Sequence, residues 1–150
     1  MPQSPVKNYM HIVFSTKNRE QLIFLPHEEK LHAYLAGICK EYECLTIKIG
    51  GYTDHVHILC MLSRKIALMT FVEKVKANSS KWIKMQNESL ENFYWQNGYG
   101  GFSVGPEDVQ GVARYISNQH EHHRDITFQD EYRKTLKDHN VDYDERYVWD

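Results

Sequence analysis

Two histidines separated by one residue, in the segment His55-Val56-His57, have a spacing that allows metal chemistry. Residues i and i+2 of a β-strand project from the same face, so both imidazoles would point together while Val56 enters the other side. Two imidazoles on one rigid strand can bind a divalent metal ion. The motif has little specificity by itself, because a chain with nine histidines often contains this spacing by chance.

Tyr115 and Gln119 form a second candidate pair, since residues four apart on a helix lie on one face. Alone, the pair is more typical of a tyrosine at the core edge beside a solvent-exposed glutamine. Together with His55 and His57, however, the Gln119 amide oxygen would complete a neutral set of three ligands. Such a set leaves a metal ion its full charge and open positions for substrate oxygens. Tyr115 would stand beside this metal, an arrangement that suits phosphoryl transfer to a protein hydroxyl.

The pattern of apolar residues predicts the elements that must position these side chains. Strands are predicted at residues 8–16, 44–51, 55–62 and 102–104, and helices at 27–42, at 66–86 and from Gly105 and Pro106 onward. This order, with a hairpin in the middle, is typical of an α+β, ferredoxin-like (split βαβ) antiparallel sheet with helices on one face and a C-terminal helix carrying Tyr115. The tail from about Phe128 is less regular, and we expect it to pack as a short helix or to cross to a partner chain.

Length and composition indicate one globular domain over residues 1–150, with 41% hydrophobic and 25% charged residues. The chain has neither an apolar run long enough to span a bilayer nor the features of a signal peptide at its start, so we expect a cytoplasmic protein with no membrane partner. The three cysteines are odd in number and form no C-x-x-C pair, which makes a disulfide framework or a zinc finger improbable. They are expected to be small apolar core residues.

The net charge of −2 argues against a simple basic protein that coats DNA, although local basic faces remain compatible with nucleic acid. Lys74, Lys81 and Lys84 share a face of the predicted helix 66–86, which fits either a solvated face or a surface that contacts phosphates. The candidate DNA contacts on this helix are Lys74, Lys76, Ser79, Ser80, Lys81 and Lys84. Trp82, Trp95 and Tyr99 could stack on unpaired bases, but core packing suits Trp82 better.

Further motifs accompany the two candidate pairs along most of the chain. They are Tyr9 and His11, Gly51 and Asp54, Lys76, Ser79-Ser80 and Trp82, Trp95-Gln96-Asn97-Gly98-Tyr99, Phe102-Ser103-Val104, Glu121-His122-His123, and the terminal group Tyr143, Asp144, Arg146, Tyr147 and Trp149. Jointly, these motifs resemble the small single-tyrosine transposases of bacterial insertion sequences (200/605 type) within the HUH endonuclease superfamily.

The resemblance implies a role for each candidate residue. His55, His57 and Gln119 would bind a divalent metal ion, Mg²⁺ or Mn²⁺, and Tyr115 would be the nucleophile that forms a 5′-phosphotyrosine with single-stranded DNA. The substrate would carry hairpin ends. The protein would be a homodimer in which Tyr115 can act in trans, in the cytoplasm of a bacterium or archaeon and associated with the nucleoid.

Three alternative functions remain at this point. The chain could be a domesticated DNA-binding protein of the same fold that no longer cleaves, although the intact set of Tyr115, His55, His57 and Gln119 argues against it. It could be a replication initiator or relaxase, but those proteins are usually larger. It could be a ferredoxin-like RNA binder without chemistry, although the segment from Tyr9 to Phe14 matches an aromatic recognition strand only loosely. His123, four residues after Gln119, fits a solvated helix end better than a group near the site.

Overall fold

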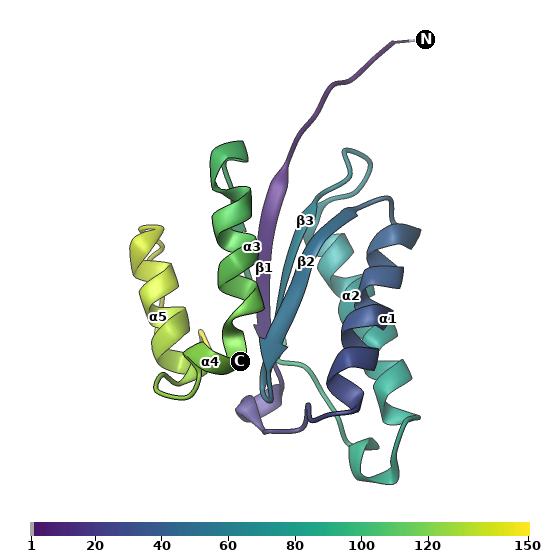
Figure 1. The fold of residues 1–150 in the computed structure, drawn as a ribbon, viewed down its shortest axis with the longest axis vertical. Helices are drawn as coiled ribbons and strands as arrows, with labels where there is room; N and C mark the ends of the chain where they lie inside the picture. The colour runs from purple at the N-terminus through teal and green to yellow at the C-terminus, as the bar shows by residue number, and fades with distance from the viewer. Residues whose placement is uncertain (1) are drawn as a thin grey trace.

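A computed structural model describes residues 2–150 as a four-stranded antiparallel sheet with helices packed against both of its faces (Figure 1). The strands are β1 (Tyr9–Ser15), β2 (Leu45–Tyr52), β3 (His55–Met61) and β4 (Gly100–Ser103), in the spatial order β2-β3-β1-β4. All neighbouring strands run antiparallel. This order is that of a split βαβ sheet, so the predicted α+β, ferredoxin-like class is confirmed.

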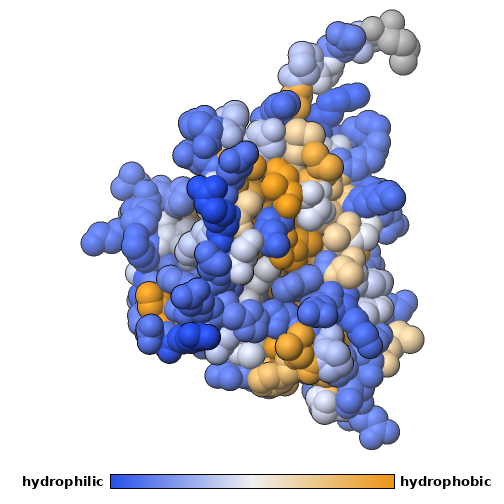
Figure 2. All heavy atoms as spheres, viewed as in Figure 1, coloured by the Kyte–Doolittle hydropathy of each residue, from blue (hydrophilic) through white to orange (hydrophobic). Residues whose placement is uncertain are grey.

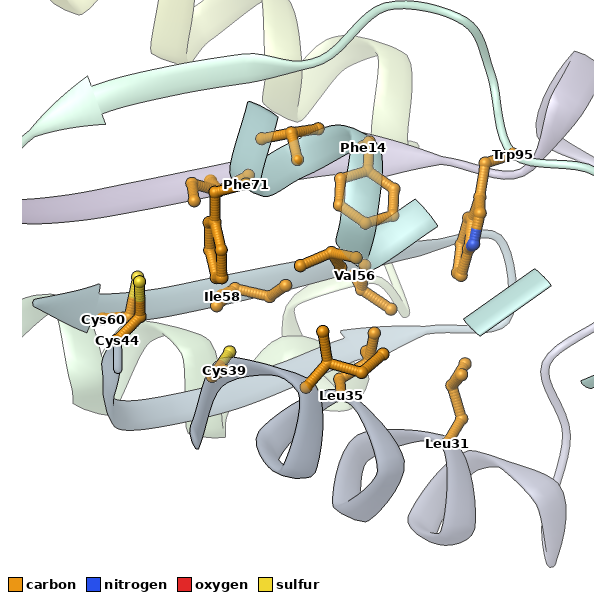
Figure 3. Packing of buried hydrophobic residues seen from close by; sticks show 14 of the residues in the cluster. Phe14, Leu31, Leu35, Cys39, Cys44, Val56, Ile58, Cys60, Phe71 and Trp95 are labelled. Atoms are coloured by element: carbon orange, nitrogen blue, oxygen red, sulfur yellow. The ribbon is translucent and has the colours of Figure 1, made fainter. Parts of the chain in front are cut away.

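The first face of the sheet is buried and carries the main hydrophobic core. Helices α1 (His27–Glu41) and α2 (Leu68–Lys84), the two crossover helices, cover it (Figure 1). Alternate residues of β1 and β3 point into this layer, as the period of two in a strand requires. Figure 3 shows how Phe14, Val56 and Ile58 of the sheet meet Leu35 and Phe71 of the helices.

The cysteines belong to the same core, as the sequence indicated. Cys39, Cys44 and Cys60 are at most 1% exposed and carry free thiols. Burial raises the pKa of the Cys39 thiol to about 11, so this thiol stays protonated and behaves as an apolar filler.

The second face of the sheet is covered by the C-terminal third of the chain. Helix α3 (Val109–Ser117) lies on the β2 side, α4 (Gln119–His122) follows it directly, and α5 (Phe128–Asp138) packs beside them (Figure 1). Three short 3₁₀ turns, Lys17–Arg19, Glu88–Leu90 and Pro106–Asp108, complete the regular elements of residues 2–150. The sequence predicted that the helices would cover one face of the sheet. The two crossover helices do so, whereas α3, which carries Tyr115, packs on the opposite face.

Two local features fix the approach of α3 and α5 to the sheet. A Cβ atom at Gly50 would lie 2.5 Å from the Ile116 carbonyl oxygen, so a residue without a side chain lets α3 lie close against β2. The Thr127 side chain accepts a hydrogen bond from the backbone N–H of Asp130, which caps the start of α5. Phe128, Tyr132 and Leu136, at helical spacing, then anchor α5 in a second apolar cluster with Val13 and Phe102.

The expected continuous helix through Tyr115 and Gln119 is interrupted. Asn118 ends α3 with φ −100° and ψ 19°, and Gln119 begins the short helix α4. The tail from Phe128 forms a helix on its own chain, which is one of the two expected outcomes. Within residues 2–150, no helix has the length and apolar character that crossing a bilayer requires.

Candidate active site

His55 and His57 lie on the second face of the sheet, and both side chains are buried, at 0% and 2% exposure. Strand alternation sends Val56, between them, into the main core. In the register of β1 and β3, His55 stands opposite Ser15 and His57 opposite Val13. The expectation that both imidazoles share one face is confirmed by this arrangement.

The Nδ1 atom of each imidazole is engaged by a neighbouring side chain. His55 Nδ1 lies 2.7 Å from an oxygen of Asp54, and His57 Nδ1 lies 2.8 Å from Nε2 of His11. These contacts orient both rings, so that both Nε2 atoms are directed toward α4 and α5. A carboxylate or other polar group behind a histidine is the usual arrangement that fixes the tautomer of a metal ligand.

Gln119 supplies an amide oxygen to the same place. Its Oε1 atom lies 2.9 Å from His55 Nε2 and 3.0 Å from Nε2 of His123, and the side chain is buried. The structure thus brings the three predicted ligands together, although Gln119 reaches them from the start of α4 and not from a continuous helix.

Glu131, on α5, was not identified from the sequence, yet its carboxylate lies at the centre of the cluster. Its Oε1 is 3.2 Å from Nε2 of His57, 3.4 Å from Nε2 of His55 and 3.3 Å from Nε2 of His123. A pattern in the sequence could have found it. Glu131 stands three residues after Phe128 and one before Tyr132, on the apolar stripe of an amphipathic helix, where a carboxylate is unexpected.

Tyr115 meets the same carboxylate from α3. Its hydroxyl donates a hydrogen bond to Glu131 Oε2, and its ring packs edge-on against His57 with centroids 5.9 Å apart. The Gln119 amide nitrogen donates to the same oxygen at 2.9 Å. Tyrosine, glutamine and both histidines of one chain therefore converge on a single carboxylate.

The protonation of these groups follows from burial and charge. Burial alone would lower the pKa of His55, but the carboxylates of Asp54 and Glu131 outweigh it and raise the pKa to about 9. For His57, burial dominates and lowers the pKa, and burial likewise brings the pKa of His11 to about 3.

The acidic members of the cluster are shifted in opposite directions. Burial would raise the pKa of Glu131, but hydrogen bonds with His123, His55 and His57 hold that pKa well below its usual range. Burial, then the negative charge of Glu131, raises the pKa of Tyr115 well above its usual value. The site thus contains a carboxylate and a neutral phenol in direct contact.

The donor atoms fit a divalent metal ion. One atom each from His55, His57 and Glu131 lie within 4.8 Å of one another, and all three residues are buried. Imidazole nitrogens with amide and carboxylate oxygens suit first-row divalent ions, and Mn²⁺ and Mg²⁺ accept the oxygen donors. Residues of this chain could therefore hold a metal ion here.

His123 lies in the site and not at a solvated helix end. It is buried, bonds to Gln119 through Nε2, and its Nδ1 lies 2.6 Å from the Ile126 carbonyl oxygen. His122 packs edge-on against Tyr115 at 5.5 Å. His120, in contrast, turns to Glu28 of α1 at 2.7 Å and links α4 to the other layer.

Several candidate DNA contacts are already engaged within the protein. The Lys76 ammonium donates to the carbonyl oxygens of Gln96, Asn97 and Gly98 at 2.8, 3.0 and 2.6 Å. Burial lowers the pKa of Lys76 to about 8. These contacts make Lys76 a tie between α2 and the 96–98 loop.

The two candidate serines, Ser79 and Ser80, also make hydrogen bonds within the protein. The Ser79 hydroxyl is buried, donates to the Val75 carbonyl and accepts from the Trp95 indole, whereas Ser80 accepts from Lys84. Of the six candidates, Lys74 and Lys81 have exposed side chains, and Lys84 lies 4.1 Å above the ring of Tyr94. Trp82 is half-buried, stacks on Tyr34 and packs against the main core, in agreement with the expected packing role.

Sequence comparison identifies the relatives of this chain. Residues 5–119 match the family model described as "Transposase IS200 like". The chain belongs to this transposase family. Transposases of the insertion sequence element IS200 from Salmonella typhimurium and from Salmonella typhi are each 25% identical over 114 residues, which cover 73% of this chain and 74% of the relative.

Solved structures of transposases share the fold. A protein assigned as a transposase from Deinococcus radiodurans R1 superposes with a TM-score of 0.62 at 20% identity, covering 79% of this chain and 98% of that one. A REP-associated tyrosine transposase bound to a REP hairpin gives a TM-score of 0.61 at 13% identity, covering 82% of this chain and 73% of that one. Glu131 lies beyond the 5–119 segment that the family model matches.

Proposed function

We propose that this transposase cleaves and rejoins single-stranded DNA at the ends of its insertion sequence through a 5′-phosphotyrosine intermediate, with a divalent metal ion. The observation that carries the proposal is the meeting of Tyr115, His55, His57 and Gln119 around one buried point of a single chain. A nucleophile beside a set of metal-binding donors is what phosphoryl transfer to a protein hydroxyl needs.

His55, His57 and Gln119 would hold the ion, Mg²⁺ or Mn²⁺. When bound, the ion would neutralise charge on the scissile phosphate as a Lewis acid. Asp54 and His11 keep the two imidazoles oriented through their Nδ1 atoms. All three donors are buried, so solvent water has little access to them.

Tyr115 would attack the phosphorus in line with the leaving 3′ oxygen. A bond forms between Tyr115 Oη and phosphorus, the bond from phosphorus to the 3′ oxygen breaks, the phenol loses its proton and the leaving oxygen gains one. The phosphotyrosine conserves the energy of the phosphodiester, so a second 3′-hydroxyl can reverse the step without ATP. The chain has no Gly-rich nucleotide loop of the G-x-x-x-x-G-K-[ST] type, which agrees with this chemistry.

DNA has access to the tyrosine through a surface pocket. A cavity of about 430 Å³ lies between the α3–α4 segment and α5, and Tyr115, His122, Glu131 and Lys134 are among the residues that line it. Lys74 and Lys81 are on α2, which covers the other face of the sheet (Figure 1). We therefore assign these two lysines to flanking DNA such as a hairpin, and a hairpin is what the REP-associated relative binds.

The homodimer remains part of the proposal. β2 lies at one edge of the sheet, where backbone groups are available for a second chain. Figure 2 shows hydrophobic residues gathered near the middle of the molecule, between hydrophilic surfaces over the helices on either side. Solution scattering should give the mass of a dimer, and a monomer at high concentration would remove this part of the proposal.

The test is a covalent adduct assay. Purified protein is mixed with Mn²⁺ and single-stranded oligonucleotides that tile the DNA flanking its gene, and the products are separated on a denaturing gel. The wild type should form an adduct band, Tyr115→Phe should form none, and the control Tyr143→Phe, which changes an exposed tyrosine, should behave as wild type. An adduct with Tyr115→Phe would reject the nucleophile, and no adduct with any protein that binds Mn²⁺ would favour a DNA-binding protein that no longer cleaves.

A further inference from the structure

We infer that Glu131 is a fourth protein ligand of the divalent metal ion and that the same carboxylate holds the Tyr115 hydroxyl beside it. The inference rests on the proposed function and deepens it, since it makes α5 part of the metal site. Neither the His-x-His pattern nor the segment matched by the family model includes this residue. The contacts of Glu131 with the predicted ligands carry the inference.

The first observation is the spacing of the donor atoms. Ligands bonded to one ion at about 2.0–2.2 Å lie roughly 3.0–3.5 Å from one another. Glu131 Oε1 is 3.2 Å from Nε2 of His57 and 3.4 Å from Nε2 of His55, and Gln119 Oε1 is 2.9 Å from the latter nitrogen. The carboxylate oxygen therefore stands among the histidines and the glutamine at the separations that ligands of one ion have.

The second observation is that the two carboxylate oxygens face different partners. Oε1 faces Nε2 of His55, His57 and His123. Oε2 accepts hydrogen bonds from the Tyr115 hydroxyl and the Gln119 amide nitrogen and lies 3.4 Å from Nε2 of His122. A carboxylate that binds a metal through one oxygen keeps the other free to accept hydrogen bonds. The carboxylate of Glu131 would thus connect the ion to the nucleophile, with Oε1 bound to the ion and Oε2 bound to the Tyr115 hydroxyl.

The third observation is that packing fixes the position of Glu131. Its side chain is 4% exposed and comes from the first turn of α5, whose start is capped by Thr127. Phe128 stacks on the ring of His55 with centroids 4.4 Å apart, and Tyr132 packs on Phe128 at 5.6 Å. A carboxylate held this firmly loses little side-chain entropy when it binds an ion.

The negative charge of Glu131 should increase the affinity of the site for a divalent metal ion. Two neutral imidazoles and an amide would leave the donor set neutral, whereas Glu131 gives it one negative charge. A negative ligand strengthens the binding of a hard divalent cation, because affinity rises with the charge of the ligands. A bound metal ion would also compensate the negative charge of this buried acid.

Calorimetric titration with Mn²⁺ alone, without DNA, tests the inference. The proteins are the wild type, Glu131→Gln, which keeps the size of the side chain and removes its charge, and Glu145→Gln, the same substitution at an exposed site. His57→Ala reports on the proposed metal site itself. We expect Glu131→Gln to weaken Mn²⁺ binding by roughly tenfold to a hundredfold and Glu145→Gln to leave it unchanged.

The outcomes separate the two proposals. Weaker binding by Glu131→Gln and by His57→Ala supports both. Equal or tighter binding by Glu131→Gln, with binding lost in His57→Ala, overturns the role of Glu131 and leaves the metal site standing. Unchanged binding by His57→Ala overturns the metal site of the proposed function.

A second measurement observes ligation directly in the wild type. The infrared spectrum of protein labelled with ¹³C-glutamate is recorded with and without Mg²⁺. Ligation should shift the carboxylate stretches of one glutamate, and Glu131→Asp, which keeps the charge but removes the labelled carboxylate at this position, should lose that shift. A spectrum that Mg²⁺ leaves unchanged, at a concentration that saturates the calorimetric site, would overturn the inference.

Discussion

The two faces of the sheet are built from the same strands but obey different physical rules. On the first face, Phe14, Val56 and Ile58 pack in a dry core where shape and volume decide stability (Figure 3). On the second face, His55 and His57 are equally buried but polar, and they lie beside a smaller apolar cluster that includes Val13. Burial here therefore has two consequences: one face stabilises the fold through apolar packing, and the other gathers polar and titratable side chains away from water.

Neighbouring residues of β1 should show the largest contrast between the faces. Phe14→Ala removes a fully buried ring that packs edge-on against Trp95 at 4.8 Å, and we expect a loss of about 3–5 kcal/mol in the free energy of unfolding. Ser15→Ala, one residue on, removes a hydroxyl that bonds to the Thr16 carbonyl and should cost about 1 kcal/mol or less. Urea denaturation measures both, and similar losses would contradict the contrast.

The pH dependence of stability should reveal the charged character of the second face in protein free of metal. The folded pKa of His55, about 9, is raised above the unfolded value of 6.5. Its contribution is therefore fully present below pH 6.5 and is lost as the pH rises through 9. The loss should be on the order of 2 kcal/mol. Burial lowers the pKa of His57, so the titration of His57 changes stability below pH 6.5 and not between pH 6.5 and 9.

The variant Asp54→Asn isolates this effect, because it removes the carboxylate next to His55 Nδ1. The difference in unfolding free energy between pH 7 and pH 9.5, measured with EDTA present, should be smaller in the variant than in the wild type. The pKa of Lys76 is lowered to about 8, so the loss of its proton increases stability as the pH rises. This increase is the same in both proteins and therefore cancels when their pH dependences are compared. An identical pH dependence in the two proteins would show that Asp54 does not stabilise the His55 cation.

Two lysines of α2 should give the most selective effects. Lys74→Ala changes an exposed side chain, so the free energy of unfolding should stay within about 0.5 kcal/mol of the wild type. The affinity for single-stranded DNA should fall, and the slope of log affinity against log salt concentration should become shallower by about 1. Lys76→Ala removes the donor from three carbonyl groups and should instead reduce stability by about 2 kcal/mol. Denaturation and fluorescence anisotropy across a salt series separate the two, and a loss of affinity without a loss of stability at Lys76 would reverse the assignment.

Local periodicity allowed much of the fold to be predicted from the sequence. The alternation of strand residues placed His55 and His57 on one face, because neighbouring side chains of a strand point to opposite sides whatever the rest of the chain does. The order of strands and helices likewise indicated the split βαβ sheet, since short connections leave few possible topologies. Helical spacing put Tyr115 near Gln119 even though the helix breaks between them.

Contacts between distant segments were decided only by the tertiary structure. Glu131 lies 74 residues after His57, and no local pattern relates the two; the packing of Phe128 and Tyr132 against the sheet brings them together. The sequence made Lys76 a candidate DNA contact, and only the structure shows that its ammonium group donates to three carbonyl oxygens of residues 96–98. By itself, the sequence determined which faces the reactive side chains share, because that depends on the period of each element. Which partners meet those faces depends on how the elements pack, and that was settled only when α3, α4 and α5 covered the second face of the sheet.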